Sequence, residues 1–140
     1  MRAYLSRRYR FSAAHRLHSD AYSEEKNWET YGKCNNPHGH GHNYVVEVTA
    51  GGRVDAQTGM VCDMVKLDEA VQKNIVSRFD HANLNLDEGF RDVVPTTENL
   101  CIEIHRKLSS VFVSGALGRV DLVRVRVEET KNNSFEYSGN

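Results

Sequence analysis

The chain has 140 residues, of which 39% are hydrophobic and 26% charged, as in ordinary globular proteins. A single domain spanning residues 1–140 is expected from this length. The formal net charge of −1 offers no electrostatic basis for binding nucleic acid or an anionic membrane. No apolar run reaches the roughly 18 residues of a membrane span, and the charged start, MRAYLSRRYRF, lacks the apolar stretch of a secretory signal. We therefore expect a cytoplasmic protein without a membrane or nucleic-acid partner.

The three cysteines are odd in number and widely spaced, which excludes a disulfide framework or a CxxC metal knuckle. We interpret all three as reduced thiols. Cys62 and Cys101 stand among apolar residues and are expected in the core. Cys34 stands in a polar segment, close to the HGHGH sequence that holds three of the seven histidines.

The first half of the chain predicts two strands separated by a long loop. Alternation from residue 4 to residue 15 predicts a strand that ends at His15. Residues 16–39 are polar and predict a loop, and loops of that length in compact domains are usually functional. Residues 40–50 predict a second strand, which the glycine pair at 51–52 is expected to end.

The second half predicts two helices and then two strands. Asp63 can cap the first helix, and Thr96 or Thr97 the second. The apolar stripes that define these helices are Met64, Leu67, Val71 and Ile75 in the first, and Leu100, Ile104, Leu108 and Val111 in the second. A loop from 80 to 95 separates them. Residues 122–129 predict a third strand and residues 135–137 a short fourth.

The predicted order is β-β-α-α-β-β. This segregation predicts an α+β fold, a four-stranded antiparallel sheet with two helices packed on one face. The opposite face, which would carry Val45, Arg124 and Arg126, is expected to be mixed and partly solvated. Oligomerisation through sheet edges is one way to cover it.

The histidines predict a metal site. His40 and His42 lie two apart at the start of a strand, so their imidazoles project to one side. If the first two strands pair as an antiparallel hairpin, His15 lies beside them. Three neutral histidines with an open fourth position describe a catalytic zinc site. The alternative is a surface histidine cluster without metal. His38 shares the parity of His40, so spacing alone does not choose between the overlapping pairs His38/His40 and His40/His42.

Two further groups are candidates for proton transfer. Cys34, as a thiolate near a dication, would act as a base or nucleophile, although an isolated loop thiol is usually inert. Asp80 could orient His81 as a proton shuttle if a loop brings their side chains together. The alternative is an ordinary pair of turn residues.

Glu129 continues the apolar face of the third strand, and a buried carboxylate needs a partner. A planar heterocycle with paired N–H donors would supply one. The alternative is that the strand ends first and the side chain reaches solvent. Helix capping explains Thr96, Thr97 and Glu98 equally well.

Taken together, five segments resemble the 6-pyruvoyl-tetrahydropterin synthase family in order and spacing, over residues 11–137. They are FSAAHRL, GKCNNPHGHGHNY, DHANLN, PTTEN and VEET. The resemblance implies the tunnelling fold (T-fold), in which three subunits close their sheets into a barrel and two trimers stack as a homohexamer. It implies conversion of 7,8-dihydroneopterin triphosphate to 6-pyruvoyl-tetrahydropterin with elimination of triphosphate, a step of tetrahydrobiopterin biosynthesis.

The resemblance also assigns roles to residues. One Zn²⁺ per subunit would be held by His15, His40 and His42, with His38 outside the ligand set. The catalytic group would be Cys34, Asp80 and His81. The pterin would be anchored by Glu129, with Glu98, Thr96 and Thr97 of PTTEN assisting. Mg²⁺ is a second candidate metal, and no residues of the sequence are assigned to it.

Two other functions stay open from the sequence. The related 6-carboxytetrahydropterin synthases share fold, metal and substrate. They tend to have three residues between the catalytic cysteine and the first zinc histidine, the number that the His38/His40 register would give here, whereas Cys34 and His40 have five between them. The second alternative is a non-catalytic zinc- or pterin-binding module, against which Cys34, Asp80 and His81 argue together.

Overall fold

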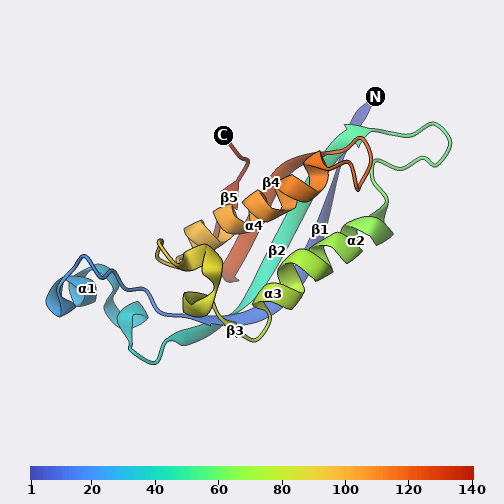
Figure 1. Ribbon diagram of the computed structural model, residues 1–140. Coiled ribbons are helices and arrows are strands. Elements are labelled where there is room, and N and C mark those ends of the chain that lie inside the picture. Colours follow the sequence, from blue (N-terminus) through green and yellow to red (C-terminus); the bar gives the residue numbers. More distant parts are fainter.

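The computed structural model describes residues 1–140 as one five-stranded sheet with helices on one face (Figure 1). The strands are β1 (Arg2–His15), β2 (His40–Arg53), β3 (Ala82–Asn83), β4 (Asp121–Thr130) and β5 (Asn133–Tyr137). Their order across the sheet is β3-β1-β2-β4-β5. All neighbours pair antiparallel except β3, which runs parallel to β1.

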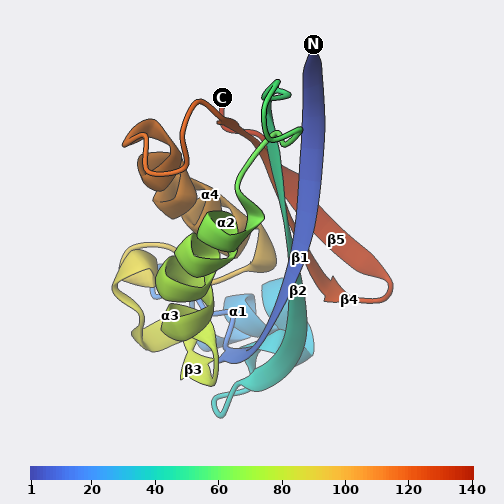
Figure 2. The same cartoon turned by 90° about the vertical axis from the view of Figure 1, so that its right-hand side faces the viewer.

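The helices are α1 (Glu24–Tyr31), α2 (Met64–Val71), α3 (Ser77–Phe79) and α4 (Thr97–Val113). A π-helical turn, Gln72–Val76, joins α2 and α3 into one continuous helical segment. Seen edge-on, α2, α3 and α4 lie on the same side of the sheet (Figure 2). None of these helices has the length and apolar content needed to cross a membrane.

The four predicted strands and the two predicted helices are all present. The prediction of a four-stranded antiparallel sheet is wrong in detail, because the sheet has a fifth strand that pairs in parallel. The fifth strand, β3, pairs only through Ala82 with Ala13 and Asn83 with Ala14. Two residues are too short a run for alternation to reveal a strand. This short parallel pairing brings the segment that follows Asp80 against the end of β1.

The predicted loop at 16–39 contains a helix as well. Ser23 caps α1 by accepting a hydrogen bond from the Lys26 amide at 3.1 Å, and Glu24 lies favourably in the first turn. Gly32, at φ +56°, ends it. Because α1 is polar on nearly all sides, it has no apolar stripe by which a helix is usually predicted. It projects away from the sheet (Figure 1).

The core lies between the sheet and the two long helical segments. Tyr44, Val46 and Val48 of β2 are fully buried beneath them. They pack with Leu67 and Val71 of α2, Leu100, Ile104 and Leu108 of α4, and Val125 and Val127 of β4. Each such apolar side chain contributes about 1.5–3 kcal/mol on burial. Cys62 and Cys101 are buried in this core, as predicted. The helices are thereby fixed over the sheet face that also carries the three histidines.

Two boundaries differ from the prediction for local reasons. Strand β2 does not end at Ala50 but continues to Arg53, because Gly51 pairs with Tyr4 and lies against its ring. A Cβ atom at Gly51 would come within 2.9 Å of that ring. Met64, assigned to the apolar stripe of the first helix, is 41% exposed, since the first turn of α2 extends beyond the core.

The uncovered face of the sheet is mixed, as predicted. A ladder of ion pairs crosses four strands: Arg8 Nε to Glu47 Oε2 at 3.1 Å, Arg124 Nη2 to Glu47 Oε1 at 3.1 Å, and Arg124 Nη1 to Glu136 Oε2 at 3.0 Å. The Glu47 side chain is 14% exposed. A face of this composition favours water or a polar partner over an apolar one.

Candidate active site

Three histidines meet where β1 ends and β2 begins. The antiparallel register places His15 opposite His40, and Ala13 opposite His42. One ring nitrogen from each of the three lies within 4.8 Å of the others, and the Nε2 atoms of His15 and His40 are 3.1 Å apart. His15 is buried and the other two are half-buried. This arrangement is compatible with a metal ion held by three imidazoles.

The surroundings of His15 suit a metal ligand. Its Nδ1 lies 2.8 Å from the carbonyl oxygen of Pro95, a contact in which Nδ1–H donates. That hydrogen bond leaves the Nε2 lone pair directed at the other histidines. Burial lowers the pKa of His15, and burial together with the neighbouring His42 lowers the pKa of His40. Both shifts favour the neutral imidazole that binds a metal.

The structure distinguishes the two overlapping HGH pairs. His38 is exposed and lies outside the cluster, and its backbone N–H donates to Asn36 Oδ1 at 3.1 Å. Only the His40/His42 register belongs to β2, because the strand begins at His40. The strand boundary therefore decides which pair faces His15.

Glu129 lies beside the histidine cluster, at the end of β4. Its Oε2 is 4.0 Å from His42 Nε2, and its side chain is 18% exposed. The Thr97 hydroxyl donates to Oε2, and Asn133 Nδ2 donates to Oε1 at 3.1 Å. Burial alone would raise the pKa of the Glu129 carboxyl, but the hydrogen bonds from Thr97 and Asn133 together with the nearby imidazoles of His42 and His15 outweigh burial and hold the pKa below its usual value. An ionised carboxylate thus lies beside the histidine cluster.

The PTTEN residues have three different environments. Thr97 is buried and contacts Glu129. The Thr96 hydroxyl caps α4 by accepting from the Asn99 amide at 3.1 Å. Glu98 is exposed in the first turn of the helix and makes no ion pair. Of these three, only Thr97 is placed next to the carboxylate.

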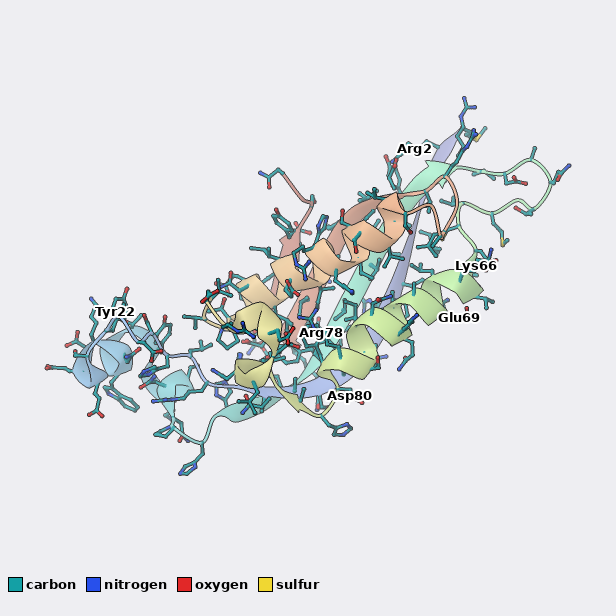
Figure 3. The ribbon with its side chains drawn as sticks, viewed as in Figure 1. Arg2, Tyr22, Lys66, Glu69, Arg78 and Asp80 are labelled. Atoms are coloured by element: carbon teal, nitrogen blue, oxygen red, sulfur yellow. The ribbon has the colours of Figure 1, made fainter.

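Asp80 and His81 form a pair immediately before β3, where Asp80 follows α3 (Figure 3). Asp80 Oδ2 lies 3.2 Å from His81 Nδ1, and Asp80 Oδ1 accepts from the Ser12 amide at 2.9 Å. His81 has φ +59°, the only non-glycine residue with a positive φ, and this conformation turns its side chain back toward Asp80. Its side chain is 85% exposed. A cleft of about 340 Å³ is lined by both His81 and His42.

Cys34 lies on the 3₁₀ turn Gly32–Asn35 that follows α1. It is half-buried, and its thiol makes no hydrogen bond. No hydrogen bond or ion pair joins it to Asp80 or His81 within one chain. The structure therefore brings together the histidines with Glu129, and Asp80 with His81, but not Cys34 with that pair.

Two polar partners at this site were missed from the sequence. The Pro95 carbonyl orients His15, and Asn133 donates to Glu129. A backbone carbonyl carries no residue-specific signal. Asn133 reaches Glu129 because an irregularity in the β4–β5 pairing lies between Glu128 and Thr130. Neither partner can be found without the tertiary structure.

Comparison with known proteins gives a consistent result. The model of the family described as 6-pyruvoyl tetrahydropterin synthase matches residues 4–140. The 6-pyruvoyl tetrahydrobiopterin synthase of Homo sapiens is 46% identical over 138 residues, covering 98% of this chain and 92% of that protein. The solved structure of Caenorhabditis elegans 6-pyruvoyl tetrahydropterin synthase has a TM-score of 0.91 and 43% identity, covering 100% of this chain and 97% of the other.

A putative 6-carboxy-5,6,7,8-tetrahydropterin synthase from Archaeoglobus fulgidus is 36% identical over a shorter stretch of 97 residues, covering 69% of this chain and 73% of that protein. The similarity is thus both higher and longer toward the pyruvoyl enzymes. The structural match confirms the T-fold predicted from the sequence motifs. The chain belongs to the 6-pyruvoyl tetrahydropterin synthase family of enzymes.

Proposed function

We propose that the protein converts 7,8-dihydroneopterin triphosphate to 6-pyruvoyl-tetrahydropterin, eliminating triphosphate, with one Zn²⁺ per subunit, in tetrahydrobiopterin biosynthesis. The observation that carries the proposal is the position of Glu129. Its carboxylate oxygen Oε2 lies 4.0 Å from His42 Nε2, beside the three-histidine cluster. A metal held by the histidines and a pterin held by Glu129 would then be neighbours.

Zinc fits the donor set. Three imidazoles without a thiolate or carboxylate, one of them oriented by a carbonyl, are typical of catalytic zinc sites that keep a position for substrate. His15, His40 and His42 would hold the ion. Bound zinc would supply Lewis acidity at the hydroxyl groups of the substrate side chain, which makes the adjacent protons more acidic.

Glu129 would hold the ring. The amino and ring N–H groups along one edge of a pterin form a pair of donors that matches a carboxylate. Because the pKa of Glu129 is held below its usual value, the carboxylate is ionised at neutral pH and able to accept both hydrogen bonds. Thr97, already donating to Glu129, would fix its rotamer. Glu98 and Thr96 are proposed only as further contributors to this end of the site.

Proton transfer is assigned to Cys34, Asp80 and His81. Cys34 as a thiolate would remove a proton from the substrate side chain, and His81, oriented by Asp80, would return one elsewhere. Triphosphate then leaves as the enol forms, and tautomerisation gives two ketones and a tetrahydropterin ring. The side chain is oxidised by the two electrons that reduce the ring, so the reaction balances without an added reductant.

The pyruvoyl product is favoured over the carboxy product on two grounds. The relatives of higher identity and coverage bear the pyruvoyl name. The His40/His42 register also leaves five residues between Cys34 and the first histidine of the pair, rather than three.

A homohexamer is part of the proposal. Strand β3 pairs with only two residues of β1, so the outer edge of β1 from Arg2 to Phe11 has no strand beside it. The outer edge of β5 is unpaired as well. Such edges readily add strands of another copy. The molar mass in solution, measured by light scattering after size-exclusion chromatography, tests this part directly.

The enzymatic proposal is tested by product analysis. The purified protein is assayed for bound metal by mass spectrometry and then incubated with 7,8-dihydroneopterin triphosphate. We expect zinc near one per chain, release of triphosphate and a pyruvoyl pterin. A carboxy pterin would favour the related synthase, and zinc with no turnover would favour the non-catalytic module.

A further inference from the structure

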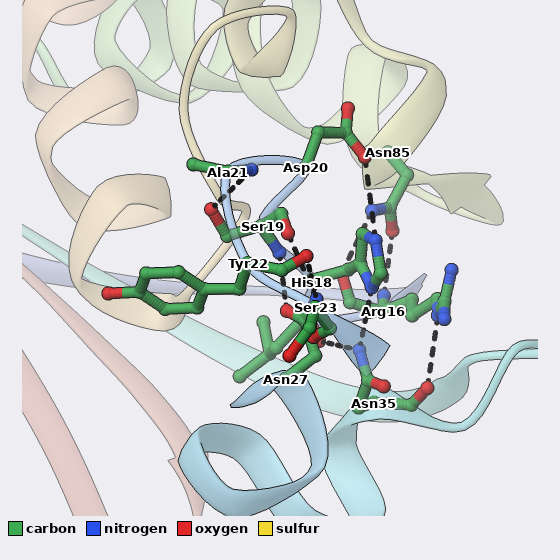
Figure 4. A network of polar contacts seen from close by, with 11 residues as sticks. Arg16, His18, Ser19, Asp20, Ala21, Tyr22, Ser23, Asn27, Asn35 and Asn85 are labelled. Atoms are coloured by element: carbon green, nitrogen blue, oxygen red, sulfur yellow. Dashed lines mark hydrogen bonds and ion pairs between the residues drawn. The ribbon is translucent and has the colours of Figure 1, made fainter. Parts of the chain in front are cut away.

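The segment directly after the metal-site residue His15 is held from two sides. On one side, the Arg16 backbone N–H donates to Asn85 Oδ1 at 2.7 Å, and its carbonyl accepts from Asn85 Nδ2 at 2.8 Å (Figure 4). The Asn85 amide thus satisfies both backbone groups of Arg16, much as a neighbouring strand would. Asn85 lies in the turn after β3, on the loop that starts with Asp80 and His81.

On the other side, the same segment holds the turn that carries Cys34. The Leu17 amide donates to the Cys34 carbonyl at 2.8 Å, and Arg16 Nε donates to the Asn35 carbonyl at 3.0 Å. The Asn35 side chain returns this contact, because its Nδ2 donates to the Leu17 carbonyl at 2.7 Å and lies 3.0 Å from His18 Nδ1 (Figure 4). Asn35 is 9% exposed, so water competes little for these hydrogen bonds.

Residues 16–18 therefore connect three parts of the site that are far apart in sequence. They follow His15 directly, they are hydrogen-bonded to the Cys34 turn through Asn35, and they are hydrogen-bonded to the His81 loop through Asn85. Neither asparagine belongs to the histidine cluster, and Asn85 makes no hydrogen bond to the Cys34 turn. The hydrogen bonds of one chain therefore connect Asn85 to the Cys34 turn through this segment.

We propose that Asn35 and Asn85 are positioning residues, which set the place of Cys34 relative to the metal ligand His15 and to the His81 loop. The catalytic consequence rests on the proposed function, whereas the structural coupling does not. Asn35 is expected to have the larger effect because it is buried; Asn85 is exposed, so water replaces part of its contribution.

The coupling is tested by alkylation of Cys34 with iodoacetamide under native conditions, followed by peptide mass spectrometry. Cys34 is the one cysteine that is not buried, so it reacts first. We expect Asn35→Ala to change its alkylation rate about tenfold and Asn85→Ala about threefold, the effect of one net hydrogen bond or part of one. The control is Asn74→Ala, since Asn74 bonds only Ala70 within its own helix and should leave the rate unchanged. Unchanged rates in both test variants overturn the proposal.

The catalytic part is read from kcat and KM in the zinc-loaded enzyme. We expect Asn35→Ala to lower kcat about tenfold with KM and zinc content nearly unchanged, and to cause no further loss in a Cys34→Ala background, because it acts through Cys34. An additional loss in that background overturns this role. Altered alkylation in the two variants, together with a wild-type protein that does not turn over the triphosphate, would support the coupling and refute the proposed function. If Asn35→Ala does not fold, Asn35→Asp removes the donation to Leu17 with little change in shape and permits the same comparisons.

Discussion

Replacing Glu129 with alanine tests the site most directly. In the structure this carboxylate accepts from Thr97 and Asn133 and faces the histidine cluster. Hydrogen bonds to a charged group contribute about 1.5–3 kcal/mol each, and two donors of a pterin edge would give about 3–6 kcal/mol. Part of this is offset, because the carboxylate also serves its present partners. We therefore expect a loss near 3 kcal/mol, which is about 100-fold in pterin affinity.

The assay is the Kd of a dihydropterin measured by fluorescence titration, together with zinc content and thermal stability. Glu128→Ala is the matched control, since it removes the same charge one residue away on the other side of β4. We expect Glu128→Ala to bind normally and both variants to retain zinc. Glu129→Ala should also lose about 1–2 kcal/mol of stability, because the buried Thr97 hydroxyl loses its acceptor. A fall in affinity below about threefold, or an equal fall in Glu128→Ala, would refute the assignment.

Three further predictions concern Cys34, the histidine register and Glu103. Cys34→Ala should retain fold and zinc but lose about 100-fold or more in kcat, as for removal of a general base; near-normal turnover would exclude Cys34 from the mechanism. In elemental analysis, His38→Ala should leave the zinc content unchanged, whereas His40→Ala should lose the zinc. Loss of zinc in His38→Ala would show instead that the His38/His40 pair binds the metal. The Glu103 carboxylate accepts hydrogen bonds from Arg106 and Arg78, and these two bonds outweigh the effect of burial and lower the pKa of Glu103. The ionised carboxylate therefore stabilises the fold above the ordinary glutamate pKa of 4.5, and this stability is lost as the pH falls through the lowered pKa. In urea titrations Glu103→Gln should therefore reduce stability at pH 7 by about 2 kcal/mol and much less near pH 3, and an equal deficit at both pH values would contradict this reasoning.

Local patterns in the sequence were sufficient to predict most of the fold and part of the site. Alternation places His40 and His42 on one face of a strand, and the same periodicity places Val125 and Val127 in the core. These features depend on residues two to four apart, for which backbone geometry alone sets the direction of side chains. The resemblance of whole motifs to a known family added the roles that spacing could not assign.

Other features depend on contacts between distant segments, and only the tertiary structure decided them. The β1–β2 register brings His15 to His40 and leaves His38 exposed, although the parity of His38 is the same. A positive φ turns His81 toward Asp80, which an extended chain would not do.

The sequence by itself determined which side chains have metal-binding and acid–base chemistry, because residue type and short-range periodicity are local properties. The tertiary structure decided which of them share one site. Strand register and the asparagine contacts around residues 16–18 join segments tens of residues apart, and their geometry follows from the packing of the whole chain.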